Sequence, residues 1–145
     1  MSALVVFDSN FGTTETVAAA IADALGGSAV LVSTVSPDSL TGVDLLVLGC
    51  PINGWRPSPR MLAFLDQLGA GSLRGIQAAA FDTRLRSPIH GDAAGKVTRK
   101  LKSAGAHVLA RPTGFIVEGK TGPLADGELD RAREWADSIV TALAS

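Results

Sequence analysis

Hydrophobic residues along the chain follow two alternating patterns. Short apolar runs, typical of strands buried on both faces, occupy residues 3–7, 29–34, 44–49, 77–81 and 107–109, and residues 115–117 continue the last run. Between the runs, apolar residues recur at helical spacing over about 15–25, 59–68, 93–104 and 126–143. Neither an internal repeat nor a linker interrupts the alternation. The pattern predicts a single α/β domain over residues 1–145.

Five apolar strands that alternate with helices predict a parallel sheet covered on both faces, which is a three-layer α/β/α sandwich with right-handed crossovers. Five strands suit the order 2-1-3-4-5, in which the winding reverses between strands 1 and 3 and ligands bind at the carboxyl edge. The longest predicted loops, 50–59 and 82–91, follow strands 3 and 4 and therefore meet at that edge.

The first loop, residues 8–14, joins the carboxyl end of a strand to the amino end of a helix. Unpaired N–H groups and the positive end of the helix dipole favour a bound anion at such a position. The loop has neither the lysine of a Walker A sequence nor the spaced glycines of a dinucleotide fingerprint. Its candidate phosphate-binding residues are Ser9, Asn10, Phe11, Gly12, Thr13 and Thr14. The alternative is an ordinary turn in which Asn10 or Thr13 caps the helix.

Ser9, Gly12 and Thr14, followed by Glu15, resemble the flavodoxin phosphate loop, [Ser/Thr]-x-[Ser/Thr]-Gly-x-Thr. The resemblance extends over nearly the whole chain and includes the segment 115–129, which is similar to short bacterial flavodoxin-domain proteins. It implies the flavodoxin-like strand order and an FMN phosphate held by hydroxyls and backbone amides without a basic side chain. Phe11 departs from the pattern where a hydroxyl is usual, which removes a hydrogen bond worth about 1.5–3 kcal/mol.

The same resemblance implies that the flavin ring lies between the loops after strands 3 and 4. The first of these loops would supply Pro51, Ile52, Asn53, Gly54 and Trp55. Trp55 is the large aromatic side chain of this loop and the candidate for stacking on the ring, although it could equally pack over the following helix. In the family, a glycine at the position of Gly54 lets the adjacent peptide flip toward the ring.

The loop after strand 4 begins with Asp82, Thr83 and Arg84, which the resemblance places along the polar edge of the ring. Arg84 would approach the pyrimidine part of the flavin. The alternative is an ordinary surface arginine. Cys50 follows strand 3, where it is either a small packing residue or a nucleophile.

The composition argues against several classes of function and of binding site. The chain has 145 residues, 46% of them hydrophobic, and a net charge of −1, which argues against general nucleic-acid binding. No apolar run reaches the roughly 18–20 residues of a membrane helix, and no signal peptide is expected. A single cysteine excludes an intramolecular disulfide and fits the cytoplasm, and the chain offers few ligands for a structural metal site.

Basic residues concentrate between Arg84 and Arg111, where seven basic side chains accompany one acidic side chain. This cluster is either the solvated face of a helix or a docking patch for an acidic partner or an anionic substrate. RNA is not expected, because no aromatic residues that could stack on bases are interleaved with the cations.

We therefore expect an FMN-binding electron-transfer protein that serves a redox partner protein and holds no catalytic residue of its own. An FMN-dependent NAD(P)H:acceptor (quinone) reductase is the enzymatic alternative. A flavodoxin-fold interaction module without flavin is the third, because fold alone does not define function.

Overall fold

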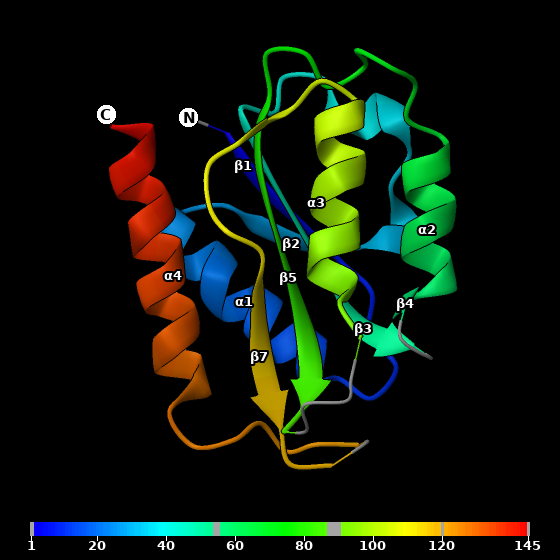
Figure 1. The fold of residues 1–145 in the computed structure, drawn as a ribbon. Coiled ribbons are helices and arrows are strands. Elements are labelled where there is room, and N and C mark those ends of the chain that lie inside the picture. Colours follow the sequence, from blue (N-terminus) through cyan, green and yellow to red (C-terminus); the bar gives the residue numbers. More distant parts are fainter. Residues whose placement is uncertain (1, 54–55, 87–90, 120, 145) are drawn as a thin grey trace.

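The computed structural model describes residues 2–53, 56–86, 91–119 and 121–144, which form one sheet with helices on both of its faces (Figure 1). In chain order the elements are β1 (Ala3–Phe7), α1 (Thr13–Leu25), β2 (Ser28–Leu31), the 3-10 turns η1 (Val32–Thr34) and η2 (Pro37–Leu40), β3 (Leu45–Asn53), β4 (Arg56–Pro57), α2 (Pro59–Asp66), β5 (Gln77–Leu85), α3 (Ala93–Ser103), β6 (His107–Val108), β7 (Thr113–Val117) and α4 (Glu128–Leu143).

The sheet has the order β2-β1-β3-β5-β6, and these neighbouring strands pair in parallel. β6 pairs with the first two residues of β5, whereas β7 pairs with the last five, Phe81–Leu85. β6 and β7 are therefore two halves of one edge strand, and the predicted order 2-1-3-4-5 is confirmed. β4 is an additional two-residue strand that pairs antiparallel with the end of β3.

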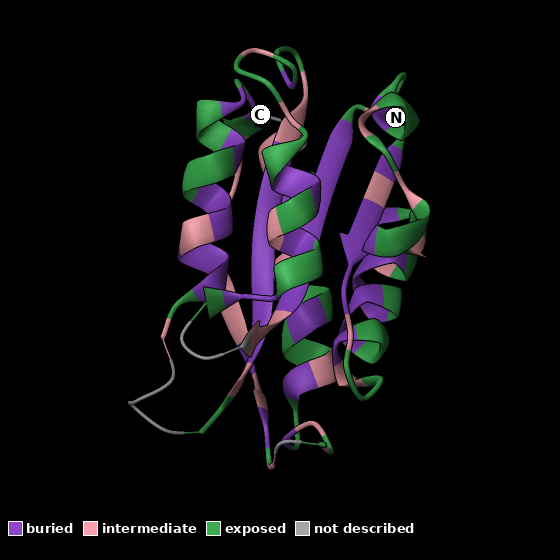
Figure 2. Ribbon diagram, turned by 90° about the vertical axis from the view of Figure 1, so that its right-hand side faces the viewer, coloured by how far each residue is buried: buried purple, intermediate pink, exposed green. Residues whose placement is uncertain are grey.

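Two apolar layers hold the helices to the sheet. α1 and α4 cover one face, and α2 and α3 cover the other (Figure 1). The central strands β1, β3 and β5 are buried along most of their length and the edge strand β2 is not, while each helix buries only the side that faces the sheet (Figure 2). On the α1–α4 side the rings of Phe81, Phe115 and Trp135 contact one another edge to face, with centroids 5.8–6.1 Å apart. This geometry is the one favoured by aromatic quadrupoles.

Two predicted loop boundaries were wrong. The loop expected over 50–59 begins as strand, because β3 continues to Asn53 and turns back into β4. The loop expected over 82–91 also begins as strand, because β5 continues to Leu85 and pairs there with β7. Both extensions carry residues that normally disfavour strands, namely a proline and charged side chains, and pairing with neighbouring strands outweighs that preference.

The second strand is also shorter than predicted, because β2 ends at Leu31 and the chain turns into η1. Ser58 stands at the predicted cap position of α2, with Pro59 following it, but its hydroxyl makes no capping hydrogen bond. Among the described helices, none combines the length and the hydrophobicity that crossing a bilayer requires.

Candidate functional site

The loop between β1 and α1 presents unused backbone donors at the carboxyl edge of the sheet. Gly12 occupies the cap position with φ 87°, a left-handed conformation that glycine adopts without steric cost. The first helical hydrogen bond runs from Thr16 N–H to the Gly12 carbonyl, at 3.1 Å, and among the described residues no side-chain capping hydrogen bond is made at this end. The N–H groups of residues 13–15 therefore precede the helical hydrogen bonding and lie at the positive end of the dipole.

The hydroxyls of this loop differ in availability. The Ser9 hydroxyl oxygen accepts the Gly12 N–H at 2.9 Å and keeps its own proton to donate. Thr14 is only 2% exposed, and its hydroxyl lies 2.8 Å from that of Thr83 in β5, which is 6% exposed. Thr13 is half-buried, and Asn10 and Phe11 are exposed. The structure thus brings two predicted site residues, Thr14 and Thr83, into contact with each other, 69 positions apart in sequence.

Sequence reasoning missed an ion pair at the base of this loop. Asp8, the residue after β1, is buried, and its carboxylate accepts Arg60 Nε at 2.8 Å and the Ser9 N–H at 3.0 Å. Arg60 comes from the first turn of α2 and also donates to Asn10 Oδ1 at 3.1 Å. The available signal was an acidic residue directly after a buried strand, since a buried carboxylate requires a partner.

The predicted ring-binding residues after β3 are placed only in part. Pro51 and Ile52 are half-buried in the last rungs of β3, where Pro51 pairs with Thr83. Asn53 ends the strand. Gly54 and Trp55 lie outside the described residues, so the stacking role of Trp55 stays a prediction.

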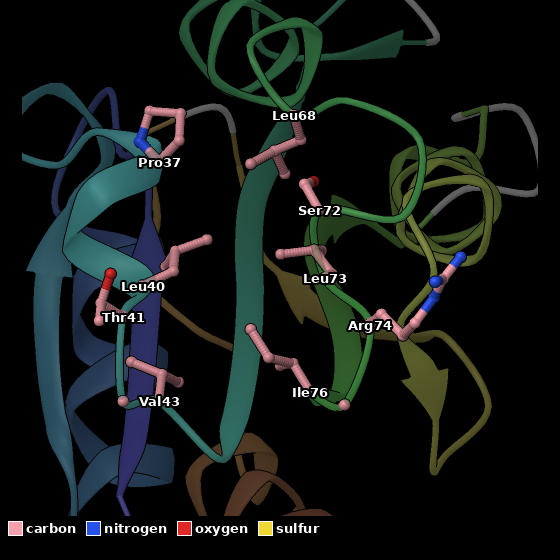
Figure 3. A pocket seen from close by; sticks show the side chains of 11 residues that line it. Pro37, Leu40, Thr41, Val43, Leu68, Ser72, Leu73, Arg74 and Ile76 are labelled. Carbon is pink, nitrogen blue, oxygen red and sulfur yellow. The ribbon is translucent and has the colours of Figure 1, made fainter.

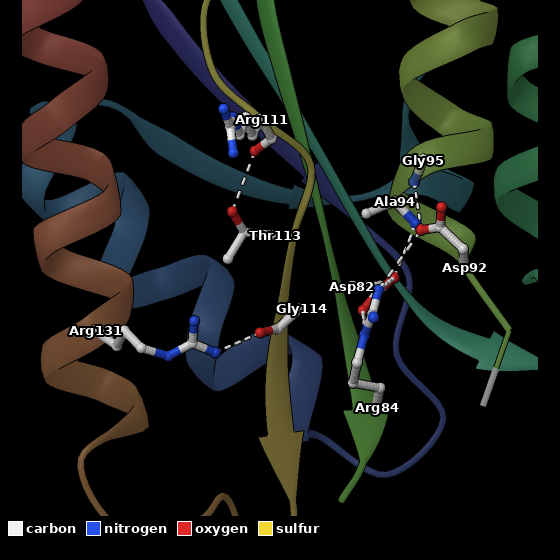
Figure 4. A network of polar contacts seen from close by, with 9 residues as sticks. All are labelled: Asp82, Arg84, Asp92, Ala94, Gly95, Arg111, Thr113, Gly114 and Arg131. Carbon is white, nitrogen blue, oxygen red and sulfur yellow. Dashed lines mark hydrogen bonds and ion pairs between the residues drawn. The ribbon is translucent and has the colours of Figure 1, made fainter. Parts of the chain in front are cut away.

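The predicted residues after strand 4 lie instead within β5, where the buried Asp82 pairs with the partly buried Arg84 (Figure 4). Arg84 Nε and Nη2 donate to the two carboxylate oxygens of Asp82 at 2.7 and 2.5 Å, and the Ala94 N–H at the start of α3 donates at 2.9 Å. The hydrogen bond to Asp82 raises the pKa of Arg84 despite partial desolvation. A Cβ at Gly114 would meet the Arg84 side chain, so this glycine of β7 leaves room for the pair.

A second polar cluster joins β7 to the start of α4. Glu128 accepts the Ile116 N–H at 2.6 Å and two donors of Arg131 at 2.8–2.9 Å. Arg131 also donates to the Gly114 carbonyl (Figure 4) and lies 4.9 Å from the centroid of the Phe115 ring. The hydrogen bonds from Arg131, followed by that from Ile116, lower the pKa of Glu128 against the effect of burial.

This depressed pKa gives a pH dependence of stability. A carboxyl whose pKa is lower in the folded than in the unfolded protein stabilises the fold above its unfolded pKa, about 4.3, and the contribution disappears as the pH falls through the folded value. We expect Glu128→Gln to be less stable than the wild type at pH 7 and the two to converge below about pH 4. Urea unfolding from pH 7 to 3 measures this, with exposed Glu134→Gln as the control. A constant difference across this range would contradict it.

Cys50 is a packing residue rather than a nucleophile. It is fully buried in β3 and pairs in register with Asp82. Burial raises the pKa of its thiol to about 12, and the nearby carboxylates of Asp82 and Asp8 add to the increase against hydrogen bonding from Ser58. The thiolate, which is the reactive form, is therefore scarce at neutral pH.

Two hollows lie away from the loop after β1. One, of about 360 Å³, opens at the amino ends of β3 and β5, between residues 37–43 and 68–76 (Figure 3), and thus at the edge opposite the loop. The other is a groove of about 390 Å³, lined by Arg56, Pro57, Leu62, Lys96, Arg99, Lys100 and Ser103. This basic groove runs between α2 and α3 and reaches β4.

The fold and the loop together define a doubly wound α/β protein in which a loop with free-standing helix N–H groups lies at the winding reversal. The family model for flavodoxin matches residues 5–135, and the chain belongs to the flavodoxin family. Members of this family bind a flavin, typically FMN, and pass electrons to redox partner proteins. A comparison with curated proteins found no significant match.

Solved structures agree on the fold. A flavodoxin from the domain Archaea has a TM-score of 0.80 at 20% identity, with 99% of each chain covered. Oxidised Flavodoxin 1 from Bacillus cereus has a TM-score of 0.82 at 20% identity, with 97% of this chain and 98% of that chain covered. A short-chain flavodoxin associated with a bacterial microcompartment has a TM-score of 0.80 at 20% identity, with 100% and 99% covered.

Proposed function

We propose that this protein binds FMN non-covalently at the carboxyl edge of its sheet and carries electrons. The observation that carries the proposal is the uncapped start of α1, where the Ser9 hydroxyl lies beside backbone donors that make no helical hydrogen bond. That arrangement suits a phosphate monoester. Family membership supplies the flavin as the group attached to the phosphate.

Exposed apolar side chains at the same edge also suit a flavin. Phe11 is 52% exposed and Leu85, at the end of β5, is 46% exposed, while Ile52 is half-buried at the end of β3. Covering such surface with a planar ring is favourable by about 25 cal/mol for each Å² removed from water. The residues present therefore fit both the charged and the apolar parts of FMN.

The protein's part in the chemistry is to bind, orient and shield the cofactor. In the proposal, Ser9, Asn10, Phe11, Gly12, Thr13 and Thr14 hold the phosphate, and Pro51, Ile52, Asn53, Gly54, Trp55, Asp82, Thr83 and Arg84 surround the ring. When bound, FMN would supply one- and two-electron transfer. The Thr14–Thr83 contact links the two groups of residues and would keep their spacing constant.

Titration of the purified protein with FMN tests the proposal. We expect shifted flavin absorbance and quenched flavin fluorescence at micromolar FMN. Absence of both would overturn it and favour the interaction module without flavin. Steady oxidation of NAD(P)H by the FMN-loaded protein would instead indicate a reductase.

We further propose that the redox partner is acidic at its docking surface. Within the basic segment, Arg84 pairs with Asp82 and Arg86 pairs with Glu118 at 3.5 Å, so both cations are already compensated. Lys96, Arg99 and Lys100 line the basic groove together with Arg56, and Lys100 lies 3.7 Å from the exposed Asp66. The groove has Pro57 and Leu62 between its cations, and β4 directly follows the segment predicted to cover the ring.

Small redox probes of opposite charge test the groove's field. For the reduced FMN-loaded protein, we expect Arg99→Glu/Lys100→Glu to slow oxidation by anionic ferricyanide about tenfold at low salt and to accelerate oxidation by cationic hexaammineruthenium(III). The differences should vanish at high ionic strength. Arg133→Glu, on exposed α4 surface, is the control. Unchanged rates with both probes would contradict steering by this groove.

A further inference from the structure

Asp8 places a buried negative charge directly before the phosphate loop. It is 2% exposed, and among the described residues its Oδ2 atom has no hydrogen-bond partner. Oδ1 carries both contacts, to the Ser9 N–H and to Arg60. A buried carboxylate costs free energy unless it is paired, and it would also repel a dianion bound at the neighbouring loop. The loop therefore requires a compensating cation if it is to hold phosphate.

Arg60 supplies that cation from a different element. Its guanidinium contacts Asp8 through Nε and the loop residue Asn10 through Nη2, so it joins α2 to the loop after β1. The side chain is still 56% exposed. A guanidinium has five N–H donors, and within the described part of the chain two of them are used. The others remain for a ligand on the solvent side of the loop.

We propose that Arg60 belongs to the phosphate site: it neutralises Asp8 and donates hydrogen bonds to the phosphate monoester of the bound nucleotide. The planar fork of donors on arginine matches phosphate oxygens. The inference rests on the proposed function and adds to it, because the resemblance alone implies a phosphate loop that works without a basic side chain. Arg60 thereby favours FMN over riboflavin, the same ring without the phosphate.

Paired titrations with FMN and riboflavin test this selectivity. We expect Arg60→Gln to raise the Kd for FMN at least tenfold and to change the Kd for riboflavin less than threefold. Arg60→Lys, which keeps the charge but not the fork, should fall between wild type and Arg60→Gln. Arg133→Gln, the same substitution on exposed α4 surface, should leave both constants unchanged. Equal effects of Arg60→Gln on FMN and riboflavin, or no effect on FMN, would overturn the proposal.

The charge-compensating role is tested in an Asp8→Asn background, where no carboxylate needs neutralising. We expect Arg60→Gln to weaken FMN binding less in this background than in the wild type. An equal loss in both backgrounds would overturn this role. If Arg60→Gln alone leaves Asp8 unpaired and does not fold, the double variant Asp8→Asn/Arg60→Gln still allows the measurement, because it has no buried carboxylate at this position.

Thermal unfolding without flavin separates this inference from the FMN proposal. Inorganic phosphate should raise the Tm of the wild type relative to chloride at equal ionic strength, and it should do so much less for Arg60→Gln. If the wild type binds no FMN but shows this Arg60-dependent shift, the FMN proposal fails and the anion site stands. If FMN binds but neither its Kd nor the phosphate shift depends on Arg60, the present inference fails alone.

Discussion

Replacing Asp82 by asparagine is expected to lower the free energy of unfolding by about 3 kcal/mol. The substitution preserves the shape of the side chain but removes the negative charge that faces Arg84. The Arg84 side chain is only 18% exposed. It also weakens the acceptor for the Ala94 N–H at the start of α3. The cost is large because the partly buried Arg84 would lose its two charged hydrogen bonds to Asp82 and keep only the longer contact with Asp92, at 3.6 Å.

A double-mutant cycle shows whether the pair is responsible. Arg84→Met should cost a similar amount alone, and Asp82→Asn/Arg84→Met should cost clearly less than the sum, because apolar replacement of a whole buried pair is often nearly neutral. Asp66→Asn, which removes an exposed partner of Lys100 at 3.7 Å, should change stability by less than about 1 kcal/mol. Guanidinium unfolding measures all four variants. Additive losses would contradict coupling between Asp82 and Arg84.

The apolar strands were the most predictable part of the fold. β1 was predicted at its observed bounds because Ala3–Phe7 is uniformly apolar and Asp8 ends the run. The alternation with helices predicted a parallel sheet with right-handed crossovers, and the resemblance to flavodoxins implied the order 2-1-3-4-5. Even the split edge strand was visible as two short apolar runs, at 107–109 and 115–117, on either side of a proline.

The strand extensions could not be predicted because they depend on partners distant in sequence. Asp82, Thr83 and Arg84 read as loop residues when considered alone. In the structure Thr83 finds the Thr14 hydroxyl, and Asp82 and Arg84 satisfy each other on one face of β5. Their burial follows from this pairing, which a local hydrophobic pattern does not reveal.

The candidate site was predictable in position but not in its electrostatics. The loop after β1 was located by its small polar residues between a strand and a helix. The Asp8–Arg60 pair joins residues 52 positions apart and forms because the first turn of α2 brings Arg60 to the loop after β1. A search for cations within the loop itself therefore misses the one that contacts it.

Gly49→Ala is expected to lower the free energy of unfolding by about 3 kcal/mol, at the upper end of overpacking effects. A Cβ at this position would overlap the ring of Phe81, the residue that pairs with Gly49 in register. The ring has no room to withdraw, because it is fully buried and contacts Phe115 and Trp135 edge to face. Chemical denaturation at neutral pH measures the loss.

The compensating variant Gly49→Ala/Phe81→Leu identifies the clash as the cause. Leucine is smaller than phenylalanine, so the added methyl group should occupy part of the space that the ring vacates, and the double variant should be more stable than the sum of the single losses implies. Gly69→Ala is the matched control, because Gly69 is exposed and a Cβ there has nothing within 4 Å. It should be neutral or stabilise by up to about 1 kcal/mol through the unfolded state. Equal losses for Gly49→Ala and Gly69→Ala would show that glycine's backbone freedom, rather than the Phe81 ring, determines the effect.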